Sequence, residues 1–306
     1  MKRDFISITD FSPVETRRLI EQAARGKAEA GRAPLSGKTV ALLFEKPSLR
    51  TKVSFQVGVA QLGGYSMYMG GDEVGLGKRE PVSDVARVLS GYVDCIVARV
   101  NRHQDLQELS QYASVPVINA LSDWEHPCQT MADLLTVYEH KGDIEGLTLA
   151  YVGDGNNVAR SLCLALPAVG MNFNCASPAG YELDAESVAK ATKRGSGLVR
   201  TMRSPSEAVA DADVVYTDVW ASMGQESEAA QRRQEFAGYT VDPALMAQAR
   251  PGALFMHDMP AHYGEEVPPG MLEHPQSAAY PQAHNRLHAQ KAVLEFLLAE
   301  SRDASP

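Results

Sequence analysis

A serine, an arginine and a threonine lie close together in the segment KPSLRTK, residues 46–52. The segment follows an apolar run and precedes a helical pattern, so Ser48 is expected near a helix N-cap, beside unpaired backbone N–H groups. With the guanidinium of Arg50 and the hydroxyls of Ser48 and Thr51, it would bind an oxyanion such as phosphate. Arg99, at a later strand end, could supply a second cation. The alternatives are an ordinary N-cap with a solvated arginine, and a surface ion pair at Arg99.

The segment HPCQ places His126 and Gln129 three residues apart at the start of a predicted helix. Both side chains can therefore point the same way and could donate hydrogen bonds to a carbonyl oxygen that gains charge during acyl transfer. A lone histidine at such a position is more often structural. A metal site is not expected, because no second His or Cys stands at ligand spacing on this element.

Two further polar segments, GDGNNVARS and TDVWASMG, each follow an apolar run. The first lacks the third glycine of a dinucleotide fingerprint, and no acidic residue closes the next strand, so dinucleotide binding is a weak interpretation. Asn156 and Asn157 at the helix start would instead suit a carboxylate. In the second segment, Asp218 lies near Ser222 and could pair with a substrate ammonium, or could simply cap a helix.

The elements that must position these side chains alternate between strand and helix. Ser12 begins a capping box that predicts a helix over about 13–30. Continuous apolar runs predict buried parallel strands at 39–45, 93–100, 115–121, 147–154, 171–177, 213–220 and 253–257. The order indicates an α/β protein with two doubly wound parallel-sheet domains, a boundary near 135–147, and the active site in the cleft between them.

Composition limits the class of protein. A chain of 306 residues suits two domains, and a net charge of −9 argues against nucleic acid or an anionic membrane as the main partner. The four cysteines show no disulfide-scaffold spacing, and neither a signal peptide nor a run of about 20 apolar residues is evident. We therefore expect a cytoplasmic enzyme or ligand-binding protein.

Taken together, these segments resemble the aspartate/ornithine carbamoyltransferase family, and its ornithine branch in particular. The resemblance extends from FEKPSLRT to NRLHAQKA, over nearly the whole chain. It implies transfer of a carbamoyl group from carbamoyl phosphate to an amine, with no metal or organic cofactor. It also implies a carbamoyl-phosphate domain at 1–135, an acceptor domain at 136–285, and a last helix at about 286–306 that packs back on the first domain. The expected assembly is a homotrimer or a multiple of trimers.

The resemblance assigns roles to two groups of residues. Those that match the carbamoyl-phosphate site are Ser48, Leu49, Arg50, Thr51, Arg99, His126, Gln129 and Arg286. Those that match the ornithine site are Asn157, Asp218, Ser222, Met223, Asp258 and Met259, of which the first four match the residues that grip the α-carboxylate and α-amino groups. The residues expected to act in catalysis are Arg99, His126, Gln129, Asp258 and Arg286. A neighbouring subunit could lend Lys78 or Arg79 to the phosphate. The reaction needs positioning, exclusion of water and stabilisation of charge, with no covalent intermediate.

The segment FMHDMP departs from the ornithine branch, where it reads His-Cys-Leu-Pro; Asp258 and Met259 replace the Cys and Leu. An amine with a pKa near ~10.4 must lose a proton before it attacks, and an ionised carboxylate beside it favours the ammonium. Three readings of Asp258 stay open. It anchors a cationic acceptor whose attacking group differs from that of ornithine; it turns away and pairs with an arginine such as Arg286; or the protein is a weakened or inactive paralogue.

Tyr263 and His284 also depart from the family pattern, where relatives carry Arg and Glu. We therefore expect carbamoyl transfer to the side-chain amine of an α-amino acid, with ornithine as the leading acceptor and an arginine-biosynthetic role if ornithine is right. The alternatives are a different amino-acid or diamine acceptor, and a carbamoyl-phosphate-binding protein without turnover.

Overall fold

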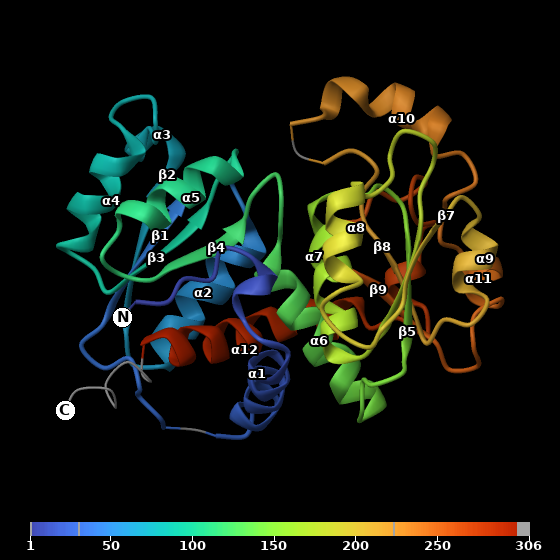
Figure 1. Cartoon of the computed structure of the whole chain (residues 1–306), viewed down its shortest axis with the longest axis horizontal. Helices are drawn as coiled ribbons and strands as arrows, with labels where there is room; N and C mark the ends of the chain where they lie inside the picture. Colours follow the sequence, from blue (N-terminus) through green and yellow to red (C-terminus); the bar gives the residue numbers. More distant parts are fainter. Residues whose placement is uncertain (1, 30, 223, 299–306) are drawn as a thin grey trace. The chain divides into compact units, whose positions relative to one another are not determined.

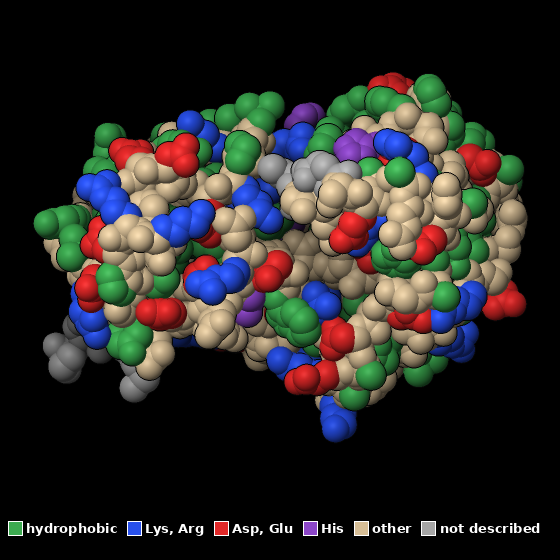
Figure 2. All heavy atoms as spheres, turned by 90° about the horizontal axis from the view of Figure 1, so that it is seen from above, with side chains coloured by type: hydrophobic (Ala, Val, Ile, Leu, Met, Phe, Trp, Pro, Cys, Tyr) green, Lys and Arg blue, Asp and Glu red, His purple; other side chains and the backbone are tan. Residues whose placement is uncertain are grey.

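The computed structural model describes residues 2–29, 31–222 and 224–298. They form two compact α/β units, one within 2–135 together with 285–298, and the other within Thr136–His284 (Figure 1). Within the described residues, no helix is long and apolar enough to cross a membrane. On the face drawn in Figure 2, acidic and basic side chains are interspersed, and neither sign forms a broad continuous patch.

The first unit is built on a parallel sheet with strand order β2-β1-β3-β4. The strands are β1 (Thr39–Phe44), β2 (Tyr65–Gly70), β3 (Cys95–Arg99) and β4 (Val117–Leu121). Every residue of β3 is buried, as are Val40 to Phe44 of β1, because both inner strands are covered on both faces. Phe44 pairs with Arg99, so the carboxyl ends of β1 and β3 lie side by side.

Helices cover both faces of this sheet. They are α1 (Pro13–Gly26), α2 (Leu49–Gln61), α3 (Gly71–Val74), α4 (Val82–Ser90) and α5 (His103–Tyr112), with a 3-10 turn at Ile8–Asp10. Side chains of α4 and α5 form one apolar cluster with Ala41, Leu43, Ile96 and Ala98 of the sheet. The α6 helix (Pro127–Lys141) and the α12 helix (Ala279–Leu298) contain the two points where the chain passes from one unit to the other.

The second unit has a parallel sheet with strand order β7-β6-β5-β8-β9. The strands are β5 (Thr148–Val152), β6 (Asn172–Ala176), β7 (Val199–Met202), β8 (Val214–Thr217) and β9 (Leu254–His257). The helices are α7 (Asn157–Ala165), α8 (Ala185–Ala191), α9 (Pro205–Val209), α10 (Ala229–Glu235) and α11 (Pro243–Met246), with 3-10 turns at Pro167–Val169, Glu226–Glu228 and Met271–Glu273. In Figure 1, α7 and α8 lie on one face of the sheet and α9 and α11 on the other.

The predicted α/β class with two parallel sheets is confirmed, and each of the seven predicted strands is present. Two strands, β2 and β7, were not predicted. Both are sheet edges with partly exposed residues, so neither contains the continuous apolar run that marks an inner strand. The first helix ends at Gly26 rather than near residue 30, because the chain turns at Lys27 and Ala28. The last helix begins earlier than predicted, at Ala279, and residues 299–306 lie outside the described part.

Candidate active site

The N-terminus of α2 carries the first polar cluster, and Ser48 is its N-cap. The Ser48 hydroxyl accepts a hydrogen bond from the Thr51 backbone N–H at 3.3 Å and donates to Thr51 Oγ1 at 2.9 Å. Arg286 of α12 donates to the same Thr51 Oγ1 at 2.5 Å. Since this oxygen accepts two hydrogen bonds, the hydroxyl hydrogen of Thr51 is directed to a further acceptor. The N–H groups at the start of a helix and the helix dipole favour an anion there.

Three arginines act on one buried histidine. His126 is 2% exposed; burial lowers the pKa of its imidazole well below the usual range, and the charges of Arg286, Arg99 and Arg50 lower it further. Arg99 and Arg286 are themselves 7% and 3% exposed. A neutral imidazole among buried guanidinium groups can donate one hydrogen bond without adding positive charge. The arrangement suits an anion with a carbonyl group attached.

Gln129 is held in one orientation by a neighbour on its own helix. Its amide nitrogen donates to Asp133 Oδ1 at 2.8 Å, and both residues are buried. The Gln129 Oε1 atom has no hydrogen-bond partner among the described residues. Because a carboxylate can only accept, this contact fixes which way the amide faces. Gln129 therefore offers an acceptor, which suits an NH₂ group better than the carbonyl oxygen expected from the sequence.

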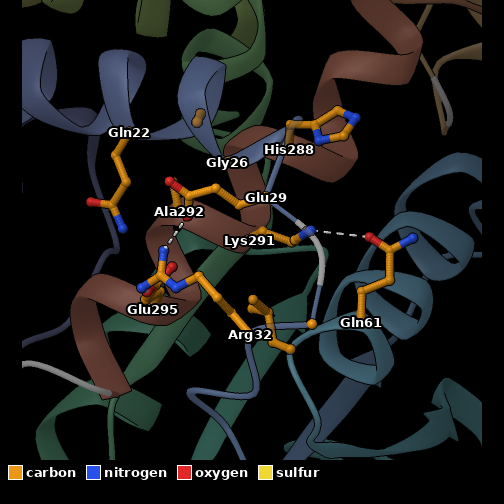
Figure 3. Close-up of a pocket in the computed structure, with 12 residues that line it drawn as sticks. Gln22, Gly26, Glu29, Arg32, Gln61, His288, Lys291, Ala292 and Glu295 are labelled. Atoms are coloured by element: carbon orange, nitrogen blue, oxygen red, sulfur yellow. Dashed lines mark hydrogen bonds and ion pairs between the residues drawn. The ribbon is translucent and has the colours of Figure 1, made fainter.

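A hollow in the first unit, drawn in Figure 3, differs from this cluster. It is lined by residues of α1, α2 and α12, and its cations already have partners. Arg32 pairs with Glu29 at 2.8 Å and also with Glu295, while Lys291 donates to Gln61 at 3.1 Å. Because the positive side chains of this hollow are already bound to acidic or amide side chains, the hollow does not resemble an anion site.

In the second unit, Asp218 follows β8 and is 6% exposed. Its Oδ1 accepts the Val219 backbone N–H at 2.7 Å, and its Oδ2 accepts the side-chain amide of Asn156 at 2.7 Å. Asn156 also caps α7, where its Oδ1 accepts from the N–H groups of Val158 and Ala159. Asp218 is thus fixed by the start of α7 and by its own turn, and it does not cap a helix.

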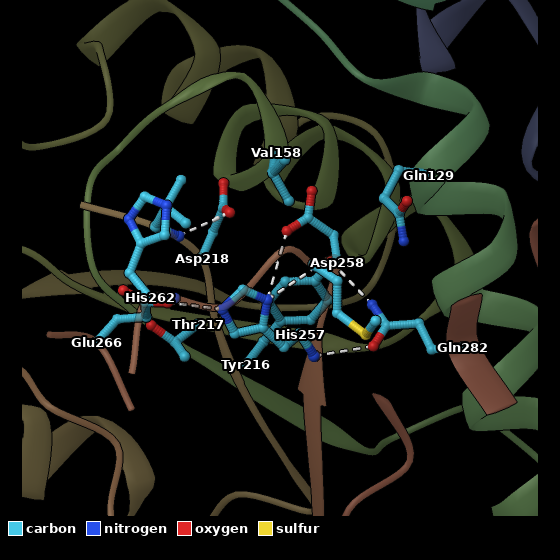
Figure 4. Close-up of polar contacts among 12 residues, drawn as sticks. Gln129, Val158, Tyr216, Thr217, Asp218, His257, Asp258, His262, Glu266 and Gln282 are labelled. Carbon is cyan, nitrogen blue, oxygen red and sulfur yellow. Dashed lines mark hydrogen bonds and ion pairs between the residues drawn. The ribbon is translucent and has the colours of Figure 1, made fainter. Parts of the chain in front are cut away.

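Asp258 lies beside Asp218 (Figure 4), and one carboxyl oxygen of each lies within 4.8 Å of the other. Burial, then the charge of Asp258 and a hydrogen bond between the two carboxyl groups, raise the pKa of Asp218 well above its usual range, while His257 and Asn156 act in the opposite direction. A carboxylate accepts hydrogen bonds and cannot donate them, so the contact requires a proton on one of the two groups. We call Asp218 and Asp258 the carboxyl pair.

His257, the residue before Asp258, is held by hydrogen bonds at both ring nitrogens. Its Nδ1 accepts the Met259 backbone N–H at 2.9 Å, so its Nε2 carries the hydrogen and meets Glu266 Oε1 at 3.2 Å. The same Glu266 oxygen accepts the His262 backbone N–H at 2.5 Å. Met259 has a positive φ of 59°, a conformation uncommon outside glycine. This network fixes the backbone at the carboxyl end of β9.

The donor atoms of Asp218, His257 and Asp258 lie within 4.8 Å of one another, a spacing that a metal ion could span. The donor set does not fit one, however. Both nitrogens of His257 are engaged, Nδ1 as an acceptor from a backbone N–H and Nε2 with a buried carboxylate. What remains is two carboxyl groups that already share a hydrogen bond, an arrangement suited to a proton or an ammonium.

The other predicted residues are less informative. Ser222 donates its backbone N–H to Gln225 Oε1 at 3.0 Å, and Asn157 opens α7 beside Asn156; Met223 lies outside the described residues. The segment before Ser222 is anchored at Trp220, whose carbonyl accepts from Arg232 Nη1 at 2.7 Å.

Four further residues that the sequence singled out, Lys78, Arg79, Tyr263 and His284, are all exposed within their own units.

Several residues of the site were not predicted. Asp133, which orients Gln129, and Glu266, which orients His257, are both buried. Gln282 is also buried and accepts the His257 backbone N–H at 2.8 Å. No sequence motif distinguished them. Their burial is the signal, because a buried carboxyl or amide group must be hydrogen-bonded and so marks a polar network.

The fold and these two polar clusters define an α/β protein of two units, with a cationic cluster suited to an anion in one unit and a cluster of carboxyl groups in the other. Two family models match the chain. The model for the aspartate/ornithine carbamoyltransferase carbamoyl-P binding domain matches residues 3–139, and that for the Asp/Orn binding domain matches residues 145–297. The chain belongs to the aspartate/ornithine carbamoyltransferase family.

Individual relatives agree with this assignment. The ornithine carbamoyltransferase of Anoxybacillus flavithermus is 50% identical over 97% of this chain and 96% of its own length. The solved structure of the Pyrococcus furiosus ornithine carbamoyltransferase matches with a TM-score of 0.93 at 46% identity, covering 97% of both chains. An acetylornithine transcarbamylase complexed with acetylcitrulline is also similar, with a TM-score of 0.88 at 30% identity, covering 96% of this chain and 99% of that one.

Proposed function

We propose that this protein is an ornithine carbamoyltransferase, which transfers the carbamoyl group of carbamoyl phosphate to the side-chain amine of L-ornithine and so forms citrulline and phosphate. The similarity to proteins of that name along 97% of the chain supports this function. The single structural observation that carries it is the convergence of Arg50, Arg99 and Arg286 on a neutral His126.

In the first unit, which we assign to carbamoyl phosphate, the phosphate lies at the N-terminus of α2. Ser48 orients Thr51, whose hydroxyl donates to the phosphate oxygens together with the backbone N–H groups of residues 49 and 50, and Arg50 compensates the charge. Thr51 is well prepared for this role because its oxygen already accepts from Ser48 and Arg286. Its hydrogen is then available to the phosphate.

The carbamoyl group lies beyond the phosphate, between charged and neutral donors. Arg99 and the N–H of His126 donate to its carbonyl oxygen, which gains negative charge as the amine attacks. Gln129 Oε1 accepts from the carbamoyl NH₂, in keeping with its orientation toward Asp133. Arg286 stabilises the charge that passes to the leaving phosphate.

In the second unit, which we assign to the amino acid, Asn157, Ser222 and Met223 bind the α-carboxylate and α-amino groups. The carboxyl pair lies toward the side-chain amine, with Met259 beside it. Two acidic groups suit a cationic acceptor, which supports a diamino acid over a neutral amine. A second candidate acceptor is N-acetylornithine, because a similar transcarbamylase was solved with acetylcitrulline.

We infer a cytoplasmic homotrimer, or a multiple of trimers, acting in arginine metabolism. The exposed apolar side chains of α2 support self-association: Leu49, Val53 and Val57 recur every four residues and are 76%, 47% and 39% exposed. The adjacent edge strand β2 exposes Tyr65 and Met67 as well. Lys78 or Arg79 of a neighbouring subunit would then complete the phosphate site. Light scattering of the purified protein would give the subunit number.

The proposed function is tested by incubating the protein with carbamoyl phosphate and ornithine, and measuring citrulline and phosphate together. We expect the two products in equal amounts, and no citrulline when either substrate is omitted. Phosphate release without citrulline, or binding of carbamoyl phosphate with no ureido product from ornithine, would contradict it.

A further inference from the structure

We propose that the carboxyl pair accepts the proton of the attacking ammonium, and that acceptor binding first expels the proton which the two carboxyl groups share. This inference rests on the proposed function, because it concerns the amine that attacks carbamoyl phosphate. It assigns a proton-transfer role to Asp258, which takes the position of a cysteine in the family pattern, and to Asp218 as its partner.

The closeness and burial of the two carboxyl groups favour a shared proton in the unliganded protein: one oxygen of each lies within 4.8 Å of the other, and Asp218 is 6% exposed. Asp218 Oδ1 and Oδ2 accept from Val219 N–H and from Asn156, both at 2.7 Å, and Asp218 is also hydrogen-bonded to Asp258. The Asp258 side chain is 12% exposed, so water screens the two groups poorly. Two ionised carboxylates at this separation repel each other, and one proton relieves that repulsion.

The described groups around the pair do not supply another counter-charge from within this unit. His257 Nδ1 lies 3.7 Å from Asp258 Oδ1, but it accepts the Met259 backbone N–H, which leaves the hydrogen on Nε2, facing Glu266. Tyr151 of β5 stays protonated, because burial and then the nearby acidic groups raise the pKa of its phenol well above the usual range. Asp154 also faces the pair, but it is paired with Arg232 at 2.7 Å. Within the unit, an ammonium is therefore the cation that would compensate two ionised carboxylates.

Over one turnover, every proton of the carboxyl pair and the ammonium can be followed. The free pair carries one proton and one negative charge. The ammonium of the acceptor takes the place of that proton, which leaves to solvent, and two carboxylates then flank the cation. One of them removes a proton from the ammonium, which restores the hydrogen-bonded pair and gives a neutral amine.

The amine lone pair forms the new C–N bond, and the C–O bond to phosphate breaks with its electrons passing to the phosphate. The second proton of the attacking nitrogen passes to the departing phosphate. The pair ends as it began, and the net product is one proton in solvent.

This cycle answers the objection that a single aspartate is too weak a base. An isolated aspartate has a pKa of about 3.9, far from the amine at about 10.4. A doubly ionised pair binds its first proton more tightly, because that proton removes the repulsion between the two charges. The relevant base is therefore the pair with both groups ionised, a state that exists only while the ammonium is bound.

The test is calorimetric titration with L-ornithine near pH ~7, in two buffers of different ionisation enthalpy. The protein is first saturated with phosphonoacetamide, an unreactive analogue in which CH₂ replaces the bridging oxygen of carbamoyl phosphate. L-Norvaline serves as the matched ligand, since it lacks only the side-chain amine. Asp258→Asn is the matched variant, because it keeps the shape and removes one of the two carboxyl groups that share the proton.

We expect about one proton released per ornithine bound to the unaltered protein, and no release with L-norvaline or with ornithine and Asp258→Asn. Equal binding enthalpies in the two buffers would overturn the inference, as would undiminished release in the variant. The same release with L-norvaline would assign the proton to the α-amino group instead and would also overturn it. Citrulline formation without proton release would refute this inference alone, whereas failure to bind ornithine would refute the proposed function as well.

Discussion

Arg50→Ala should weaken binding of the carbamoyl-phosphate analogue phosphonoacetamide while leaving the fold intact. Arg50 is the second residue of α2, only partly buried, and near enough to His126 to lower the pKa of its imidazole. Its removal takes one charged donor from the phosphate but leaves the helix N-terminus, Thr51 and the other two arginines in place.

The size of the effect follows from the contact that is lost. A hydrogen bond to a charged group contributes about 1.5–3 kcal/mol, and about 1.4 kcal/mol corresponds to a factor of ten in the dissociation constant. The variant should therefore bind phosphonoacetamide about 10- to 150-fold more weakly. The temperature of thermal unfolding should change little, because few buried contacts are removed.

The assay is calorimetric titration with phosphonoacetamide at fixed ionic strength, since salt screens charge. Arg87→Ala is the matched control: it also removes one positive charge, but Arg87 lies on α4, is 55% exposed and pairs with Asp84. We expect the control to bind like the unaltered protein. An unchanged dissociation constant for Arg50→Ala, or equal weakening in the two variants, would refute the assignment of Arg50 to the phosphate.

Three further predictions concern stability and pH. Gly155→Ala should destabilise the fold by about 1–3 kcal/mol in denaturant titration, because the added Cβ would lie 2.4 Å from the Leu183 backbone nitrogen. In the control, Gly26→Ala, the added Cβ meets nothing within 4 Å, so this variant should be neutral or stabilising. Glu15→Gln should lower the free energy of unfolding at neutral pH by at most about 1 kcal/mol and have no effect near pH 2. The hydrogen bond from Arg3 lowers the pKa of Glu15 from 4.5 to about 2. The stability that ionised Glu15 contributes is therefore present above pH 4.5 and is lost as the pH falls from 4.5 to 2. His126 should show no protonation by NMR at pH 6.5, since its pKa lies well below that value; a titration midpoint near 6.5 would contradict the description of the pocket.

The inner strands could be predicted because burial on both faces demands an uninterrupted apolar run, as in Val40 to Phe44. Two of the edge strands, β2 and β7, could not, because Tyr65–Gly70 and Val199–Met202 are partly exposed and have a mixed composition. The edge strands β4 and β9 are apolar runs and were predicted. The start of α1 was readable from Ser12 and Glu15, a local pair whose capping box is present. Helix caps and apolar runs, which are local signals, were thus reliable predictors, whereas strands without an apolar run could be found only from the structure.

The site shows the same division. That polar residues gather at strand ends followed from parallel topology, and the segments around Ser48 and Asp218 were identified that way. The contact of Asn156 with Asp218, across 62 positions of the chain, needed the structure. The contact of Asp258 with Asp218 also needed the structure. From the sequence alone Asp258 is an isolated aspartate with an ordinary pKa, whereas in the structure a neighbouring carboxyl group lies beside it.

The most direct test of the proposed function is a competition between acceptors. The protein is given ¹³C-labelled carbamoyl phosphate and an equimolar mixture of ornithine, lysine, 2,4-diaminobutyrate, N-acetylornithine and putrescine, and the labelled ureido products are identified by mass spectrometry. We predict citrulline as the dominant product, with Asp258 serving a pocket for the ornithine side chain. A dominant product from another acceptor, or no labelled ureido compound at all, would contradict that function.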